Sequence, residues 1–170
     1  MPSESARATS AAESRFRLEH PNSKPRIVTV VALDPPSEAV VRRLSDGRWN
    51  GASFLTASAF SGHTVEPGRF SMAGWLSDLA GRTKDLIDEV GRADAVVMIA
   101  TVGEDMEPAA IIAEACHARH VMTTVMILGS AAQSDDALAR ALAQLRPYAS
   151  MLVIASDEGY LADMLSALRA

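Results

Sequence analysis

The alternation of apolar and polar segments predicts a chain in which strands and helices follow one another. Continuous apolar runs rich in β-branched residues are typical of parallel strands that are buried on both faces. Five such runs are Arg26–Leu33, Ala52–Ala57, Ala95–Ala100, Val121–Leu128 and Met151–Ala155. A short additional edge strand is expected near Thr64–Val65.

Apolar residues at helical spacing lie between these runs. Asp34 as N-cap, with Pro35 at the first helical position, predicts a helix that ends at Gly47. Further helices are predicted over Ser71–Val90, over Pro108–His120, after a cap at Ser134, and over Asp157–Arg169. This alternation predicts an α/β fold: a three-layer, doubly wound, Rossmann-like and mainly parallel sheet. The expected strand order is 3-2-1-4-5-6, with the switch point between the first and fourth strands.

The length and composition agree with one domain and a tail. A chain of 170 residues with 48% hydrophobic content can bury one sheet on both faces, so residues 25–170 are predicted to form a single domain. Residues 1–24 are rich in Ser, Ala, Arg and Glu and show no sustained periodicity. They are predicted to form a disordered tail.

Charge and cysteine content narrow the class of protein. Sixteen basic and twenty-one acidic residues give a formal charge of −5, and no Lys/Arg-rich stripe with interleaved aromatics is present, so nucleic-acid binding is not expected. No segment resembles a signal-peptide core or reaches transmembrane length, so we expect no membrane insertion and a cytoplasmic location. Cys116 is the only cysteine, which rules out an intrachain disulfide.

A ligand crevice in such a fold is expected at the switch point, between the loops Asp34–Ser37 and Thr101–Pro108. The candidate binding residues are Asp34, Ser37, Gly103, Glu104, Asp105, Met106 and Glu107. Several carboxylates in one crevice suit Mg²⁺, Ca²⁺ or a cationic ligand. Alternatively, the same carboxylates cap and complement helix N-termini. The pattern favours the capping role, and it assigns no catalytic residue, no metal ligand and no cofactor.

Two other groups of residues have a possible chemical role. Cys116, His117 and His120 could bind a metal or form a nucleophilic centre, since Cys116 and His120 would share one helix face. No fourth ligand is near in sequence, which favours a helix-end cluster with a buried thiol. His63 and Glu66 could form an acid/base pair, although two polar loop residues alone do not establish one.

Several segments resemble, in the same order, the amino-terminal GTP-binding domain of the FtsZ/tubulin family. They are Ser37–Leu44 (SEAVVRRL), Ala93–Val97 (ADAVV), Ala109–Glu114 (AAIIAE), Thr123–Ile127 (TTVMI) and Met151–Asp157 (MLVIASD). The similarity covers most of residues 26–165. The resemblance implies the nucleotide-binding fold of that family, with its phosphates at the two loops of the switch point.

Both phosphate loops depart from the glycine-rich pattern of the family. Asp34, Pro35 and Pro36 replace the first glycine run, and only Gly103 remains in the second loop, among Glu104, Asp105, Glu107 and Pro108. Proline has no N–H to offer a phosphate. A carboxylate about 4 Å from a phosphate would cost about 4 kcal/mol at an effective dielectric near 20. We therefore expect nucleotide affinity to be lost.

Other family features are also replaced. Val41 stands where the family has Asn, and Ser58-Ala59-Phe60 stands where it has Asn-Thr-Asp. Within these 170 residues the resemblance does not reach the family's central helix, catalytic acidic loop or activation domain, so polymer-coupled GTP hydrolysis is not expected.

The sequence therefore predicts a degenerate, non-catalytic FtsZ/tubulin-like domain that acts as an interaction or regulatory module. One alternative is a small-ligand-binding protein or enzyme that uses the acidic crevice, with or without a divalent ion. Another is residual nucleotide binding without hydrolysis. The expected partner is a protein or a second copy in a homodimer, because the family covers part of this apolar surface with its central helix.

Overall fold

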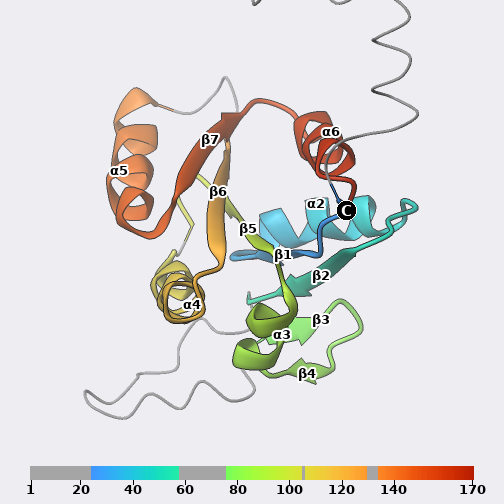
Figure 1. The fold of residues 1–170 in the computed structure, drawn as a ribbon. Coiled ribbons are helices and arrows are strands. Elements are labelled where there is room, and N and C mark those ends of the chain that lie inside the picture. Colours follow the sequence, from blue (N-terminus) through green and yellow to red (C-terminus); the bar gives the residue numbers. More distant parts are fainter. Residues whose placement is uncertain (1–23, 58–75, 105, 130–133) are drawn as a thin grey trace, which may run out of the picture.

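A computed structural model describes residues 24–57, 76–104, 106–129 and 134–170. Its centre is a seven-stranded sheet in the order β4-β3-β2-β1-β5-β6-β7 (Figure 1). The parallel strands are β1 (Val28–Ala32), β2 (Ala52–Thr56), β5 (Ala95–Thr101), β6 (Met122–Leu128) and β7 (Met151–Ala155). The mainly parallel, doubly wound fold and the predicted strand order are confirmed. The strand next to β2 is β3 (Leu76–Asp78), which is antiparallel, and a seventh strand, β4, lies outside it.

Helices cover both faces of the sheet and complete three layers (Figure 1). One face packs against α2 (Pro35–Ser45) and α6 (Gly159–Ala167). The other face packs against α3 (Leu86–Arg92), α4 (Glu107–Ala118) and α5 (Asp135–Leu145), and the short 3-10 helix η3 (Arg146–Tyr148) leads from α5 to β7. None of the helices among the described residues is long and apolar enough to cross a membrane.

The central strands form two cores because successive side chains of a strand point to opposite faces. In β5, Val96 and Met98 pack toward α3, α4 and α5. Val97 and Ile99 pack toward α2 and α6. All four side chains are at most 1% exposed, which explains why this strand has an uninterrupted apolar sequence.

The helix starts follow the predicted capping chemistry. Asp34 caps α2 in a capping box with Ser37, and Pro35 and Pro36 occupy the first turn. Ser134 caps α5, where its hydroxyl accepts a hydrogen bond from the N–H of Ala137.

The helix predicted over Ser71–Val90 is wrong for most of its described part. Residues 76–84 form an antiparallel hairpin of β3 and β4 (Thr83–Lys84), and α3 begins only at Leu86. The turn is set by Asp78, whose carboxylate accepts hydrogen bonds from the backbone N–H groups of Ala80 and Arg82. Gly81 has a φ of +80°, which is left-handed and ends helical geometry. The edge strand predicted at Thr64–Val65 lies outside the described residues, as does the tail predicted over residues 1–24 except for Lys24.

Candidate functional site

Asp34 lies at the switch point between β1 and β5, and its carboxylate is directed into the protein. The side chain is 2% exposed. Its Oδ1 accepts the N–H of Ser37 at 2.8 Å, and its Oδ2 accepts the N–H of Thr101 at 2.7 Å. The Ser37 hydroxyl closes the capping box through the backbone of Asp34. For Asp34 the capping role weighed from the sequence is therefore confirmed, and the carboxylate also bridges two adjacent strands.

The first turn of α2 leaves few donors for an anion. Pro35 and Pro36 have no N–H. The N–H of Ser37 is bonded to the Asp34 side chain, and the N–H of Glu38 is bonded to the Asp34 carbonyl oxygen. A helix N-terminus binds phosphate through its unpaired N–H groups. This turn has none among its first four residues.

The second predicted loop bonds to Asp34 through Thr101, while its later described residues lie beside α4 and α5. Gly103 has a φ of +92° and is exposed, as is Glu104, whose N–H donates to the Thr101 carbonyl. Met106 is only 7% exposed and packs in the core. Glu107 is exposed in the first turn of α4 and complements the positive end of the helix. Asp105 lies outside the described residues.

The predicted candidates do not meet in one crevice. Gly103, Glu104, Met106 and Glu107 line a cavity of about 760 Å³ between α4 and the α5–η3 segment, which we call the α4–α5 cavity. Neither Asp34 nor Ser37 lines it. The convergence of carboxylates that the sequence suggested is thus absent from the described residues, because Asp34 turns toward Ser37 and Thr101.

A second cavity, of about 410 Å³, lies at the carboxyl ends of β5, β6 and β7, and we call it the α2–α6 cavity. Arg43 of α2 and Glu158 before α6 line it and are joined by two hydrogen bonds, one of them 3.0 Å between Nε and Oε2. The hydrogen bonding to Glu158 raises the pKa of the Arg43 guanidinium. Thr101 also lines this cavity, and its Oγ1 is buried with no hydrogen-bond partner among the described residues.

Pro36 and Thr101, one residue from each of the two predicted loops, line the α2–α6 cavity, but sequence reasoning did not include Arg43 and Glu158 in the site. These two residues are far apart in the chain. The one available signal was topological, since β5, β6 and β7 end at the same edge of a parallel sheet.

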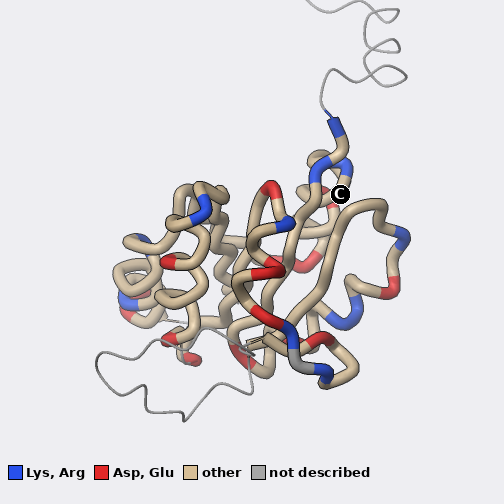
Figure 2. The backbone as a smooth tube through the Cα atoms, turned by 60° about the horizontal axis from the view of Figure 1, so that its bottom comes forward, with Lys and Arg blue, Asp and Glu red and all other residues tan. Residues whose placement is uncertain are grey.

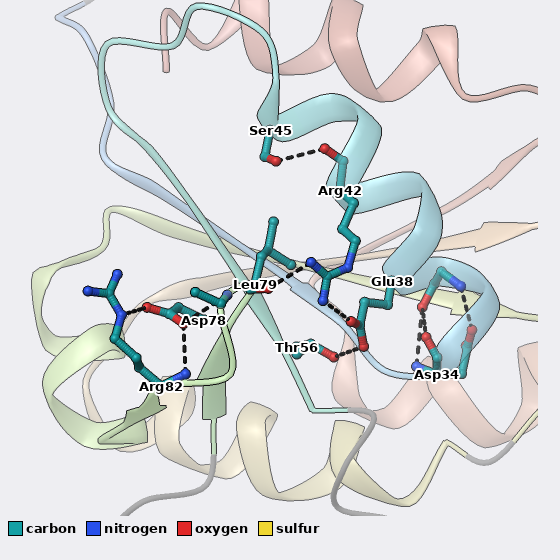
Figure 3. Close-up of polar contacts among 10 residues, drawn as sticks. Asp34, Glu38, Arg42, Ser45, Thr56, Asp78, Leu79 and Arg82 are labelled. Atoms are coloured by element: carbon teal, nitrogen blue, oxygen red, sulfur yellow. Dashed lines mark hydrogen bonds and ion pairs between the residues drawn. The ribbon is translucent and has the colours of Figure 1, made fainter.

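A second polar network joins α2 to β2 and to the β3–β4 turn (Figure 3). Glu38 accepts hydrogen bonds from the Thr56 hydroxyl at 2.9 Å and from the Arg42 guanidinium at 2.7 Å. Arg42 also donates to the carbonyl oxygen of Leu79 at 2.7 Å. These bonds fasten α2 to the end of β2 and to the β3–β4 turn. We assign the network to the fold because its charges are paired within the protein.

The group around Cys116 has the geometry of a helix end. Cys116 is fully buried, and this burial raises the pKa of its thiol to about 12. His117 is exposed. His120 lies beyond the end of α4 at a left-handed φ of 56°. The prediction that Cys116 and His120 share a helix face is therefore wrong. In the described part of the chain, no three or more His, Cys, Asp or Glu side chains lie close enough to hold a metal ion. His63 and Glu66 lie outside the described residues.

The charges of the described surface are mixed. In Figure 2, Lys and Arg positions are interspersed with Asp and Glu positions around the backbone. A protein that follows a phosphate backbone needs a continuous basic stripe. No continuous run of Lys and Arg positions is seen along the described backbone in this view (Figure 2).

Comparison with known proteins gives little further information. No protein-family model and no curated protein matches the sequence. A solved structure with some likeness is that of an aerotolerance-related membrane protein from Bacteroides fragilis NCTC 9343, with multiple mutations to serines. It is 12% identical over 83% of this chain and 97% of its own, with a TM-score of 0.41. This likeness is too distant to support an argument about function.

Proposed function

We propose that this chain is a non-catalytic, cytoplasmic FtsZ/tubulin-like domain that acts as an interaction or regulatory module and neither binds nor hydrolyses GTP. The observation that carries the proposal is the internal bonding of the Asp34 carboxylate to Ser37 and Thr101. In the fold that the sequence resembles, this position belongs to a phosphate loop. Here a carboxylate uses the donors that a phosphate would need.

The energetic argument has two parts. A phosphate at the start of α2 would have to displace Asp34 from two hydrogen bonds, and each bond to a charged group contributes about 1.5–3 kcal/mol. If Asp34 stayed in place, the two anions would repel by about 4 kcal/mol at 4 Å and an effective dielectric near 20. Both routes disfavour nucleotide binding by orders of magnitude.

An interaction role is supported by the exposed apolar side chains. Large hydrophobic residues are exposed on β6 and β7 and on the segments that flank β7. They are Met122, Tyr148, Met151, Ile154 and Tyr160. Two of them, Met151 and Ile154, lie on the edge strand β7, and exposed large apolar side chains are a feature of surfaces that contact another protein.

Isothermal titration calorimetry of the full chain with GTP and with GDP, each in the presence of Mg²⁺, tests the proposal. We expect no saturable heat up to about millimolar nucleotide, which corresponds to a binding free energy weaker than about −4 kcal/mol. ATP serves as the control for nonspecific heats. Saturable binding of GTP or GDP at micromolar concentration would contradict the proposal.

A second candidate function is the binding of a small polar ligand in the α2–α6 cavity. The observation that favours it is the buried Thr101 hydroxyl, which lines the cavity without a hydrogen-bond partner in the described chain. A buried polar group of this kind is costly unless something pairs with it. A thermal-shift screen of metabolites against the wild type and Thr101→Val tests it. A compound that stabilises only the wild type supports this candidate, and the absence of any such compound speaks against it.

A further inference from the structure

The two edges of the sheet differ in how they are protected. One edge is β4, which has two residues, one of them Lys84, and follows Arg82. The other is β7, whose sequence MLVIA contains no charged residue and no proline. Natural proteins usually shorten or charge an exposed edge strand, because its open backbone groups pair readily with another strand. Among the described residues nothing pairs with the outer side of β7.

The backbone groups on the outer side of β7 can be assigned from the register. The carbonyl of Ala155 accepts a hydrogen bond from the N–H of Gly129 and therefore faces β6. Residues of a parallel strand direct their backbone groups alternately to the two sides. Met151 and Val153 thus face β6 as Ala155 does, while Leu152 and Ile154 present N–H and C=O groups outward.

The side chains of β7 are exposed on both faces of the sheet. Ile154 is 51% exposed on the face that carries α4 and α5, since its partner on β6 is Ile127. Met151 is 47% exposed on the opposite face, where Met122 of β6 is 46% exposed. A second strand laid beside β7 would cover apolar surface on both faces as well as the open backbone groups.

The charges at the ends of β7 are opposite in sign. Arg146 in η3 precedes the strand, and Asp157 follows it; both are exposed. Arg146 makes no ion pair with any residue that the structure describes. When two copies of one strand lie antiparallel, the amino end of each is beside the carboxyl end of the other. Arg146 would then lie at the same end as Asp157 of the second copy, and this complementarity favours an antiparallel partner of identical sequence.

We propose that β7 pairs antiparallel with β7 of a second copy, around a two-fold axis at Val153, to form one continuous sheet. In this register Leu152 of one copy exchanges hydrogen bonds with Ile154 of the other, and Val153 lies opposite its own equivalent. The proposal specifies the partner of the interaction module proposed above. Its tests use no nucleotide, so the two proposals fail independently.

The oligomeric state of the protein tests whether β7 forms the contact between two copies. Sedimentation equilibrium of the wild type over about 5–300 μM is expected to show a reversible dimer, whose dissociation depends on concentration by mass action. Ile154→Lys places a charge on the edge and is expected to raise the dimer Kd at least about tenfold. Ile27→Lys is the matched control, because Ile27 is 48% exposed just before β1, away from β7. A wild-type monomer at every concentration, or equal effects of the two variants, would overturn the proposal. Circular dichroism spectra of both variants serve to check that they remain folded.

The register has its own test by disulfide crosslinking. In Val153→Cys, the two new thiols would lie across the axis at a Cα separation of about 4.5–5.5 Å, which permits a disulfide. Ser150→Cys places the thiols away from each other, at opposite ends of the paired strands. Native Cys116 is buried and does not compete. A crosslinked dimer from Val153→Cys but not from Ser150→Cys is expected. Crosslinking of Ser150→Cys alone, or equal crosslinking of both, would rule out the proposed pairing.

Discussion

The Oδ2 atom of Asp34 accepts the backbone N–H of Thr101 at 2.7 Å and so joins the start of α2 to the end of β5. Because β1 and β5 are neighbours at the switch point, this bond joins the two loops at the place where a doubly wound fold usually admits a ligand. One side chain thus caps a helix, holds two loops together and occupies an anion position.

Asp34→Asn is expected to destabilise the fold although asparagine is a good N-cap. Its oxygen can still accept the N–H of Ser37, but its amide would present a donor to the N–H of Thr101. Loss of this bond with a buried donor left unpaired costs about 1–3 kcal/mol. Urea unfolding measures the change. Asp85→Asn is the control, because Asp85 caps α3 through one exposed bond and should change by less than about 0.5 kcal/mol. Equal effects of the two substitutions would refute the bridging role.

Substitution of two glycines by alanine is expected to change the stability of the fold in opposite directions. Gly103 has a φ of +92° with open space around a Cβ, so Gly103→Ala meets only backbone strain and should cost about 1 kcal/mol. Gly91 lies within α3, where a Cβ would make an ordinary contact with Arg119. Gly91→Ala should stabilise the fold by about 0.5 kcal/mol. Thermal unfolding of the two variants checks both signs, and a stabilising Gly103→Ala would show that the loop is not held in this conformation.

The buried thiol of Cys116 is expected to make stability fall at alkaline pH. Burial raises its pKa from the ordinary 9.0 to about 12, so the folded protein keeps a proton that the unfolded chain releases. The contribution is complete below pH 9.0 and is lost as the pH rises toward about 12, by at most about 1.4 kcal/mol per pH unit. Urea unfolding at several alkaline pH values should show a steeper decline for the wild type than for Cys116→Ala. Parallel declines would mean that the thiol is accessible to solvent.

The sequence predicted the parallel core well because its signals there are local and strong. Runs such as Ala95–Thr101 contain no polar residue before their last position, and Asp34 with Pro35 begins α2 as the capping preferences require.

The β3–β4 hairpin was missed for a physical reason. Leu76, Leu79 and Leu86 fit a helical spacing, but Asp78 and Gly81 form a turn, and pairing of Leu76–Asp78 with β2 outweighs the helical preference.

The candidate site was predictable only in part. Local sequence identified the cap at Asp34, whereas its bond to Thr101 depends on the tertiary placement of two loops 67 residues apart. The expected meeting of Asp34 with Glu104 and Glu107 failed because side-chain direction cannot be deduced from loop composition. The edge position of β7 followed from the predicted strand order, but the exposure of Met151 and Ile154 did not, since an uncharged apolar run is typical of a buried strand.

The central claim is that Ser37 and Thr101 give their N–H groups to Asp34 and leave none for a phosphate. Amide-resolved NMR of ¹⁵N-labelled protein, titrated with GTP and Mg²⁺, observes these two groups directly. The account predicts that the Ser37 and Thr101 signals stay unshifted up to about millimolar GTP, a concentration that would saturate any site of useful affinity. Saturable shifts of both signals, together with that of Gly103, would show that a nucleotide displaces Asp34 and would contradict the account.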